Sequence, residues 1–273
     1  MLRGLARHRT GVAGLVLLVV IGLGGAAAPL LSPTPPTEQV LAEGLAGPTA
    51  AHPFGQDRLG RDVMSRVLYG ARISMLVAVI VVGVSALIGL AVGGIAGYAG
   101  GLLDEAVMRV IDILQAFPGI LLAIALASIL GPSLQHVIVA LTVIWWVGFA
   151  RLTRGQVLLA REMEFVAAAR ALGMSRGRLL ARHLIPNILA PITVEASFGM
   201  AAAIMAEASL SFLGLGVEPP TPSWGAMLNE ARQYLVVAPH LVLFPGLTIM
   251  ATVLAFNFVG DALRDILDPR SRP

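Results

Sequence analysis

The stretch from Ile73 to Tyr98 reads ISMLVAVIVVGVSALIGLAVGGIAGY and contains no charged residue. A helix needs about 20 consecutive apolar residues to cross the hydrocarbon core of a bilayer. This stretch is therefore long enough to span a membrane once. In lipid the backbone has to satisfy its own hydrogen bonds, which a helix does within one segment. The stretch thus predicts a membrane-spanning helix rather than a strand.

Five further apolar runs have a comparable length. They cover approximately residues 11–31, 113–130, 134–152, 188–213 and 241–259. Pro118 lies inside the run at 113–130 and is expected to kink it. Only 13% of all residues are charged, compared with about 25% in soluble domains. The sequence therefore predicts an all-α membrane protein with six transmembrane helices.

The apolar runs divide the chain into four parts. These are an N-terminal tail with the first span and the start of an outer loop (1–50), the rest of that loop (51–72), a transmembrane domain with a long loop at 151–187 (73–262), and a C-terminal tail (263–273).

The first span has a second interpretation. The basic N-terminus (Arg3, Arg7 and Arg9), the apolar run and the small residues Ala26–Ala28 are also typical of a secretory signal with a cleavage site. The apolar core of such a signal is about 7–15 residues long, and this run is longer. We therefore expect the span to be retained as an anchor.

The basic residues predict the orientation, because cytoplasmic loops are enriched in Lys and Arg. All 19 basic residues are Arg. With the N-terminus in the cytoplasm, six spans place 14 of them inside and five outside. Both termini are then cytoplasmic. The outer five are exceptions to the rule: Arg58, Arg61, Arg66, Arg72 and Arg232. Because the arginines follow the loops, they indicate topology rather than nucleic-acid binding.

The loop at 151–187 is too long for a simple turn and is expected to form two short helices. In the first, Phe165, Ala168, Ala169 and Leu172 follow the spacing i, i+3, i+4, i+7 and predict one apolar face. Such a hairpin fits two roles equally well on its pattern alone. It can lie on an anionic membrane surface, or it can dock on another protein.

The ends of these two helices are also predicted. Gly173 stands where a helix C-terminus favours a left-handed residue. Ser175 is expected to cap the second helix. Pro186 and Asn187 are expected to end it before the fifth span.

Several classes of chemistry are disfavoured. Without Lys there is no Walker A loop, so we expect the chain not to be an enzyme and not to bind ATP by that chemistry. Without Cys there are no disulfides or thiol ligands. The five histidines are scattered and show no paired metal-binding spacing. We therefore expect no metal site and no cofactor in the chain itself.

Glu195 is the most informative polar residue inside a span. It lies eight residues into the fifth run, roughly 12 Å from its inner end. Ionisable groups at such depth usually face a bundle interior or an aqueous cavity. We interpret Glu195 as lining a translocation path or facing a partner. The alternative is an interhelical hydrogen bond with no substrate role. For Glu207 in the same span we expect an ordinary structural contact, and for Arg109 and Asp112 a local pair on one helix face.

The stretches EFVAAARALGMS (164–175) and RHLIPN (182–187) resemble the EAA loop of ABC importer permeases. The family pattern is Glu-Ala-Ala, three residues, Gly, nine residues and Ile-x-Leu-Pro. Ala168, Ala169, Gly173 and Pro186 match it in register. Two positions depart from the pattern: Ala167 stands in place of the family's Glu, and Ile185 in place of its Leu. The chain therefore lacks the carboxylate with which that Glu would form a salt bridge.

Four flanking stretches narrow the resemblance. Residues 52–74, 207–216, 219–225 and 260–269 are similar to segments of dipeptide and oligopeptide permeases, in particular the DppC/OppC-like half of the permease pair. The resemblance covers about residues 50–270 and implies the type I ABC importer fold with a cytoplasmic coupling helix.

The resemblance also implies a mechanism and partners. Residues 165–172 would dock in a groove of an ATP-binding subunit, and Gly173 would act as a hinge. The coupling residues that it assigns are Glu164, Phe165, Ala168, Ala169, Leu172, Gly173 and Pro186. The implied partners are two ATP-binding subunits that use ATP and Mg, a second homologous permease, an extracytoplasmic solute-binding protein and membrane lipid.

The implied activity is import of di- or oligopeptides across the cytoplasmic membrane by alternating access. Two alternatives stay open on the sequence. One is an importer of nickel or another small solute, whose permeases resemble peptide permeases. The other is a self-sufficient secondary transporter, in which ionisable groups often lie at mid-membrane.

Overall fold

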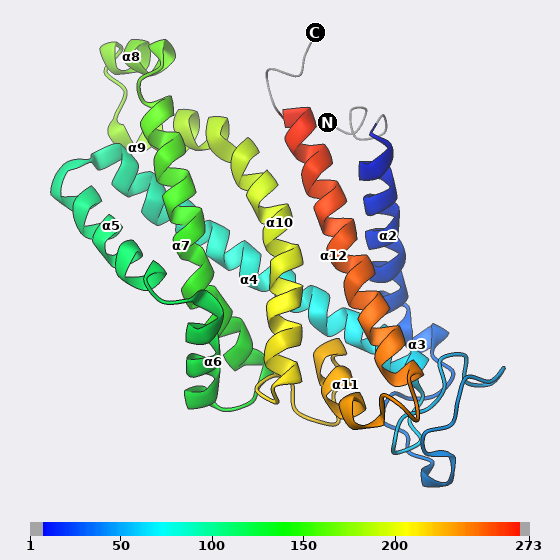
Figure 1. The fold of residues 1–273 in the computed structure, drawn as a ribbon. Coiled ribbons are helices and arrows are strands. Elements are labelled where there is room, and N and C mark those ends of the chain that lie inside the picture. Colours follow the sequence, from blue (N-terminus) through cyan, green and yellow to red (C-terminus); the bar gives the residue numbers. More distant parts are fainter. Residues whose placement is uncertain (1–7, 268–273) are drawn as a thin grey trace.

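A computed structural model of the chain describes residues 8–267. These residues form a helical bundle and contain no β-strand (Figure 1). Five helices are long and apolar enough to cross a membrane. They are α2 (Arg9–Ala26), α4 (Val63–Ala99), α7 (Leu134–Ala160), α10 (Ile185–Phe212) and α12 (His240–Leu267). The sixth is a pair, α5 (Gly101–Gln115) and α6 (Gly119–Leu130), bent by 82° at its junction. The predicted all-α, six-span fold is confirmed.

The shorter elements lie between the long helices. They are α3 (Ala28–Leu31), η1 (Leu41–Glu43), α8 (Glu164–Ala171), α9 (Arg176–Leu179), η2 (Leu180–Leu184), α11 (Trp224–Ala231) and η3 (Arg232–Tyr234). Arg3 and Arg7 of the basic N-terminus and residues 268–273 of the C-terminal tail lie outside the described residues.

Several predicted span boundaries are wrong. Helix α4 begins at Val63, ten residues before the expected Ile73, because the Asp62 carboxylate caps it by accepting a hydrogen bond from the Ser65 amide at 2.6 Å. Helix α7 continues to Ala160, so the loop that follows begins near residue 161 instead of 151. The expected kink at Pro118 is a break: α5 ends before it, and Pro118 occupies the position before α6.

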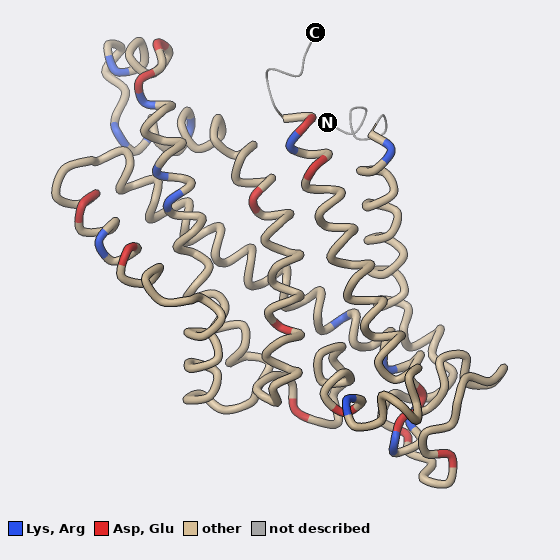
Figure 2. The backbone as a smooth tube through the Cα atoms, in the orientation of Figure 1, with Lys and Arg blue, Asp and Glu red and all other residues tan. Residues whose placement is uncertain are grey.

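The bundle has two distinct ends (Figure 1). Helices α8 and α9 lie at one end, together with the start of α2 and the end of α12; we call this the hairpin end. Residues 32–62 and α11 lie at the other, which we call the loop end. Figure 2 shows most charged residues at these two ends and along α5. The arrangement matches the predicted threading, while the membrane side of each end stays a prediction.

Helices α4 and α7 make the most extensive helix pair, and glycines make it possible. Gly89, Gly93 and Gly97 recur every four residues on the side of α4 that faces α7. A Cβ on Gly93 would lie 2.2 Å from the Ala150 carbonyl oxygen, and one on Gly89 would lie 2.3 Å from Phe149 Cβ. Small residues at this spacing let two backbones approach closely in a membrane.

Candidate functional site

Helices α8 and α9 form a helical hairpin, and α8 ends before Gly173, as predicted. Gly173 has φ +76°, in the left-handed region. Its amide donates to the Arg170 carbonyl at 2.9 Å, and the Met174 amide donates to the Ala169 carbonyl at 3.1 Å. These two bonds form a Schellman motif, so the chain reverses sharply after α8.

The predicted apolar face of α8 divides into two. Ala169 is buried together with Val166, and both pack against α7 and the start of the next span. Phe165, Ala168 and Leu172 point away from the bundle, and Leu172 is 87% exposed. The prediction is therefore wrong for Ala169, because Val166 and Ala169 form the inner stripe at spacing i, i+3. The other stripe is exposed, from 38% for Phe165 to 87% for Leu172, and is available to a partner.

The second helix of the hairpin differs from the prediction in two ways. Ser175 occupies the N-cap position, but its side chain makes no capping hydrogen bond. Pro186 does not end the helix, because a π-helical turn at Leu180–Leu184 leads directly into α10. Pro186 lies in the first turn of α10, where a missing amide hydrogen costs little. The hairpin is therefore joined to α10 without a break.

Two arginines contact the end of α4: Arg161 from the end of α7 and Arg170 from α8. Nη1 of Arg161 donates to the Gly97 carbonyl at 3.1 Å. The Arg170 guanidinium lies 5.7 Å from the centre of the Tyr98 ring. Cationic groups stabilise a helix C-terminus, where carbonyl groups are unpaired. Glu164 is exposed and makes no ion pair with the described residues.

The broken pair α5–α6 is tied to α7 by two ion pairs. Nη2 of Arg154 donates to Asp104 Oδ2 at 2.7 Å, and Nη2 of Arg151 donates to Asp112 Oδ1 at 2.6 Å. The expected pair between Arg109 and Asp112 is therefore wrong. The cross-helix contact prevails because α5 packs alongside α7, which brings Arg151 to Asp112.

Glu195 is exposed on α10 and lines two adjoining cavities. The first, of about 600 Å³, lies between the α5–α6 junction, α7 and α10. Four aromatic residues contribute to its lining: Phe117, Trp145, Phe149 and Phe198. The second, of about 430 Å³, lies between α10 and α12. The Glu195 carboxylate makes no ion pair or hydrogen bond with the described residues, so it is free to meet a ligand or partner.

Glu207, also on α10, has a different environment. It is fully buried. Its Oε2 accepts a hydrogen bond from Ser74 Oγ at 2.9 Å, and its Oε1 accepts one from Ser211 Oγ at 2.7 Å. The bond from Ser74 joins α10 to α4, and the bond from Ser211 lies within α10. Both agree with the structural contact predicted for Glu207.

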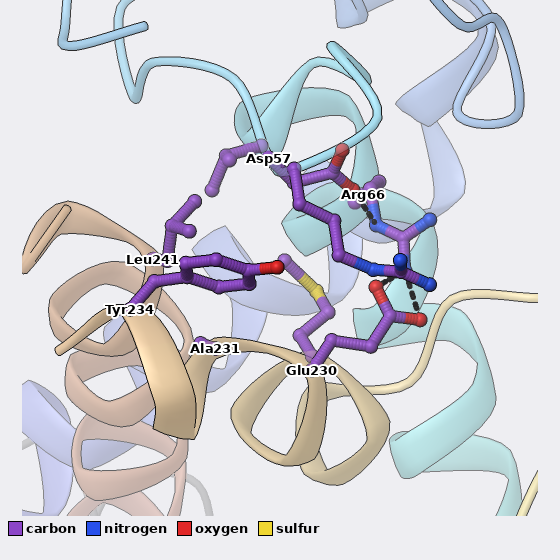
Figure 3. A pocket seen from close by; sticks show the side chains of 9 residues that line it. Asp57, Arg66, Glu230, Ala231, Tyr234 and Leu241 are labelled. Carbon is purple, nitrogen blue, oxygen red and sulfur yellow. Dashed lines mark hydrogen bonds and ion pairs between the residues drawn. The ribbon is translucent and has the colours of Figure 1, made fainter. Parts of the chain in front are cut away.

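The loop end holds a cluster of largely buried charges that we call the outer ion-pair cluster: Asp57, Arg61, Arg66 and Glu230. Figure 3 shows three of them, Asp57, Arg66 and Glu230, from close by. Nε of Arg61 donates to Asp57 Oδ2 at 2.6 Å, and Nη2 of Arg61 donates to Glu230. Nε of Arg66 lies 3.6 Å from Asp57 Oδ2, and Nη2 of Arg66 lies 3.5 Å from Glu230 Oε2. Arg61 and Arg66 belong to the five arginines that the predicted orientation places outside, and carboxylates neutralise both.

This cluster was not predictable from the sequence. Asp57 and Arg61 are four residues apart, but they lie in an irregular segment before α4, where the helical i, i+4 rule predicts no pair. Glu230 comes from α11, far along the chain, so no local pattern links it to the arginines.

Comparison with known proteins places the chain in a family. The sequence model described as a binding-protein-dependent transport system inner membrane component matches residues 89–273. The one described as the N-terminal TM domain of oligopeptide transport permease C matches residues 1–48.

Two curated relatives extend over most of the chain. The dipeptide transport system permease protein DppC of Alkalihalophilus pseudofirmus is 45% identical over 268 residues, which is 98% of this chain and 88% of the relative. The glutathione transport system permease protein GsiD of Escherichia coli O157:H7 is 50% identical over 224 residues, 82% of this chain and 74% of the relative.

A solved structure shares the fold. In inward-facing crystals of the MetNI methionine ABC transporter, one chain superposes with a TM-score of 0.57 at 20% identity, covering 74% of this chain and 96% of that chain. Fold, apolar spans and family matches together define a multi-pass membrane permease of the ABC importer class. The chain belongs to the family of binding-protein-dependent transport system inner membrane components, in its dipeptide and oligopeptide permease branch.

Proposed function

We propose that this chain forms half of the pathway of a peptide importer and is driven by separate ATPase subunits. The names of the relatives support the substrate class, because DppC belongs to a dipeptide system and GsiD to a glutathione system, and glutathione is itself a tripeptide. A second homologous permease would supply the other half. An extracytoplasmic solute-binding protein would deliver the peptide.

The observation that carries the coupling proposal is the exposed stripe of α8. Phe165, Ala168 and Leu172 form an unpartnered apolar surface on a helix that is otherwise fixed to the bundle. Apolar side chains of this kind serve as anchors when they enter a pocket on a partner. The partner would be the ATP-binding subunit, which would hold ATP and Mg.

The attachment of the hairpin supports a mechanical role. Its inner stripe, Val166 and Ala169, packs on the bundle, and its second helix runs directly into α10. A displacement of α8 by the ATPases would therefore be passed to α10, which lines the cavities beside Glu195. In this proposal ATP binding opens the pathway to the outside, and hydrolysis returns it to the inward-facing state.

The test is the substitution Leu172→Asp in the assembled transporter. The side chain is 87% exposed, so the hairpin itself should fold normally. A charge in the ATPase pocket should weaken ATPase binding by at least about tenfold, which corresponds to about 1.4 kcal/mol. Co-purification of the ATPase subunits and ATP-driven uptake of a dipeptide into proteoliposomes would be measured.

The matched control is Val236→Asp. Val236 is 93% exposed and lies at the loop end, away from the hairpin. It should retain the ATPase subunits. Normal co-purification and uptake by Leu172→Asp would refute the docking proposal.

A further inference from the structure

Two opposite charges line the cavity between α10 and α12 without pairing. Glu195 comes from α10 and Arg264 from α12. No ion pair joins them, and Arg264 makes no ion pair with any other described residue. Figure 2 shows the charged positions on these two neighbouring helices toward the hairpin end. The same cavity therefore offers both a negative and a positive group that no described residue neutralises.

The adjoining larger cavity adds an apolar compartment to the same site. Glu195 and Phe198 line both cavities, so the two spaces meet at this part of α10. Gln115, Trp145 and Phe149 also line the larger space. Apart from Glu195 and Arg264, the linings of the two cavities contain no charged residue of the described chain. The site therefore combines one carboxylate, one guanidinium, one amide and aromatic walls.

This set of groups matches the chemistry of a short peptide with free termini. A guanidinium binds a carboxylate through two parallel hydrogen bonds. A carboxylate pairs with an ammonium group in the same way as with Lys. Aromatic walls accept side chains of varied shape. The cavity volumes, about 600 and 430 Å³, fall within the range of roughly 300–1,000 Å³ that is typical of small-molecule sites.

We propose that Glu195 binds the terminal ammonium group of the peptide and Arg264 its terminal carboxylate during passage, while the aromatic cavity receives its side chains. This inference rests on the proposed function, in that the cargo is a peptide. It goes further by assigning terminal-charge recognition to the permease itself and to two named residues.

The experiment measures binding to the purified, nucleotide-free transporter complex in the absence of its solute-binding protein. Saturation-transfer NMR would give the affinities of three probes: alanyl-alanine, its N-acetyl derivative and its C-terminal amide. In the wild-type complex each blocked peptide should bind about tenfold more weakly than the free peptide.

The two variants should give a crossed pattern. Glu195→Gln should abolish the discrimination against the N-acetyl peptide and keep that against the amide. Arg264→Gln should do the reverse. A merely structural role would lower all three affinities together. The matched controls are Glu218→Gln and Arg232→Gln, which are exposed, belong to the loop between α10 and α12, and line neither cavity; both should behave as wild type.

Two outcomes overturn the inference: no measurable peptide binding, or unchanged preferences in both variants. Failure of both variants to form the complex would assign the two charges to the interface with a second permease, and would also overturn the inference. ATP-driven uptake of alanyl-alanine by the complete wild-type system separates this inference from the proposed function. If uptake occurs without the crossed pattern, only the terminal-charge assignment fails. If no peptide is taken up, the proposed function fails as well.

Discussion

At the loop end, the buried residue Arg66 shows how single side chains hold two helices together. Its side chain is 2% exposed, and that of Arg61 is 3% exposed. A buried charge is tolerated only when it is paired and hydrogen-bonded. Asp57 and Glu230 supply these partners from two distant parts of the chain. The cluster thereby fixes α11 to the start of α4.

Removing one partner of the outer ion-pair cluster should be costly. We predict that Glu230→Gln lowers the free energy of unfolding by about 3 kcal/mol, the lower end of the range for breaking a buried pair. The lower end applies because the Glu230 side chain is 24% exposed. The measurement is an unfolding titration of the purified chain with SDS, followed by circular dichroism.

The control for this prediction is Glu218→Gln, in the exposed loop before α11. Its side chain makes no ion pair with the described residues, and its change should stay within about 0.5 kcal/mol, as for ordinary surface substitutions. Equal stability of the two variants would show that the cluster contributes nothing beyond surface charge.

At the scale of elements, the contact between α4 and α7 depends on three glycines. Gly93→Ala should lower the free energy of unfolding by about 1–3 kcal/mol, the usual cost of overpacking. The reason is that its Cβ would lie 2.2 Å from the Ala150 carbonyl oxygen and would force the helices apart. Gly83→Ala on the same helix is the matched control, because its Cβ would have nothing within 4 Å. It should be neutral or slightly stabilising, and a loss equal to that of Gly93→Ala would refute the packing argument.

Some elements were predictable because their determinants are local. The apolar runs gave the six spans, and Gly173 gave the end of α8 through its left-handed conformation. The start of α4 was missed because its first turns carry Arg66 and Arg72, which look unsuitable for a span until their surroundings are known. The π-helical turn at Leu180–Leu184 was missed because Pro186 was expected to end the helix, whereas it lies in the first turn of α10.

The candidate site was predictable only in part, because one of its two charges depends on tertiary packing. Glu195 could be singled out as a charge inside an apolar run. Arg264 could not, because in the sequence it belongs to an ordinary basic tail. Only the packing of α12 against α10 brings it to the same cavity as Glu195. Likewise, the inner stripe of α8 could not be predicted without knowing which face of α8 packs against α7.

At the scale of the whole molecule, α4 connects the two ends of the bundle. Its 37 residues correspond to a length of about 55 Å, compared with about 30 Å for the hydrocarbon core, and it crosses the bundle obliquely (Figure 1). At the loop end, Trp224 Nε1 donates to the Val67 carbonyl at 3.0 Å. At the hairpin end, Arg161 and Arg170 hold its C-terminus. A displacement of the hairpin therefore has to break these contacts or carry α4 with it.

The predicted orientation, with a cytoplasmic N-terminus, places the hairpin end inside and the loop end outside. The chain is suited to a labelling test because it contains no Cys. We predict that Ala50→Cys, exposed at the loop end, reacts with a membrane-impermeant maleimide in intact cells. Thr10→Cys, exposed at the hairpin end, should react only after the membrane is permeabilised. The unmodified chain provides the blank, and dipeptide uptake would verify that each variant is correctly inserted. The reverse pattern would invert the orientation inferred from the arginines. Labelling of both variants in intact cells would place residues 10 and 50 on the same side, which would contradict the single span predicted between them.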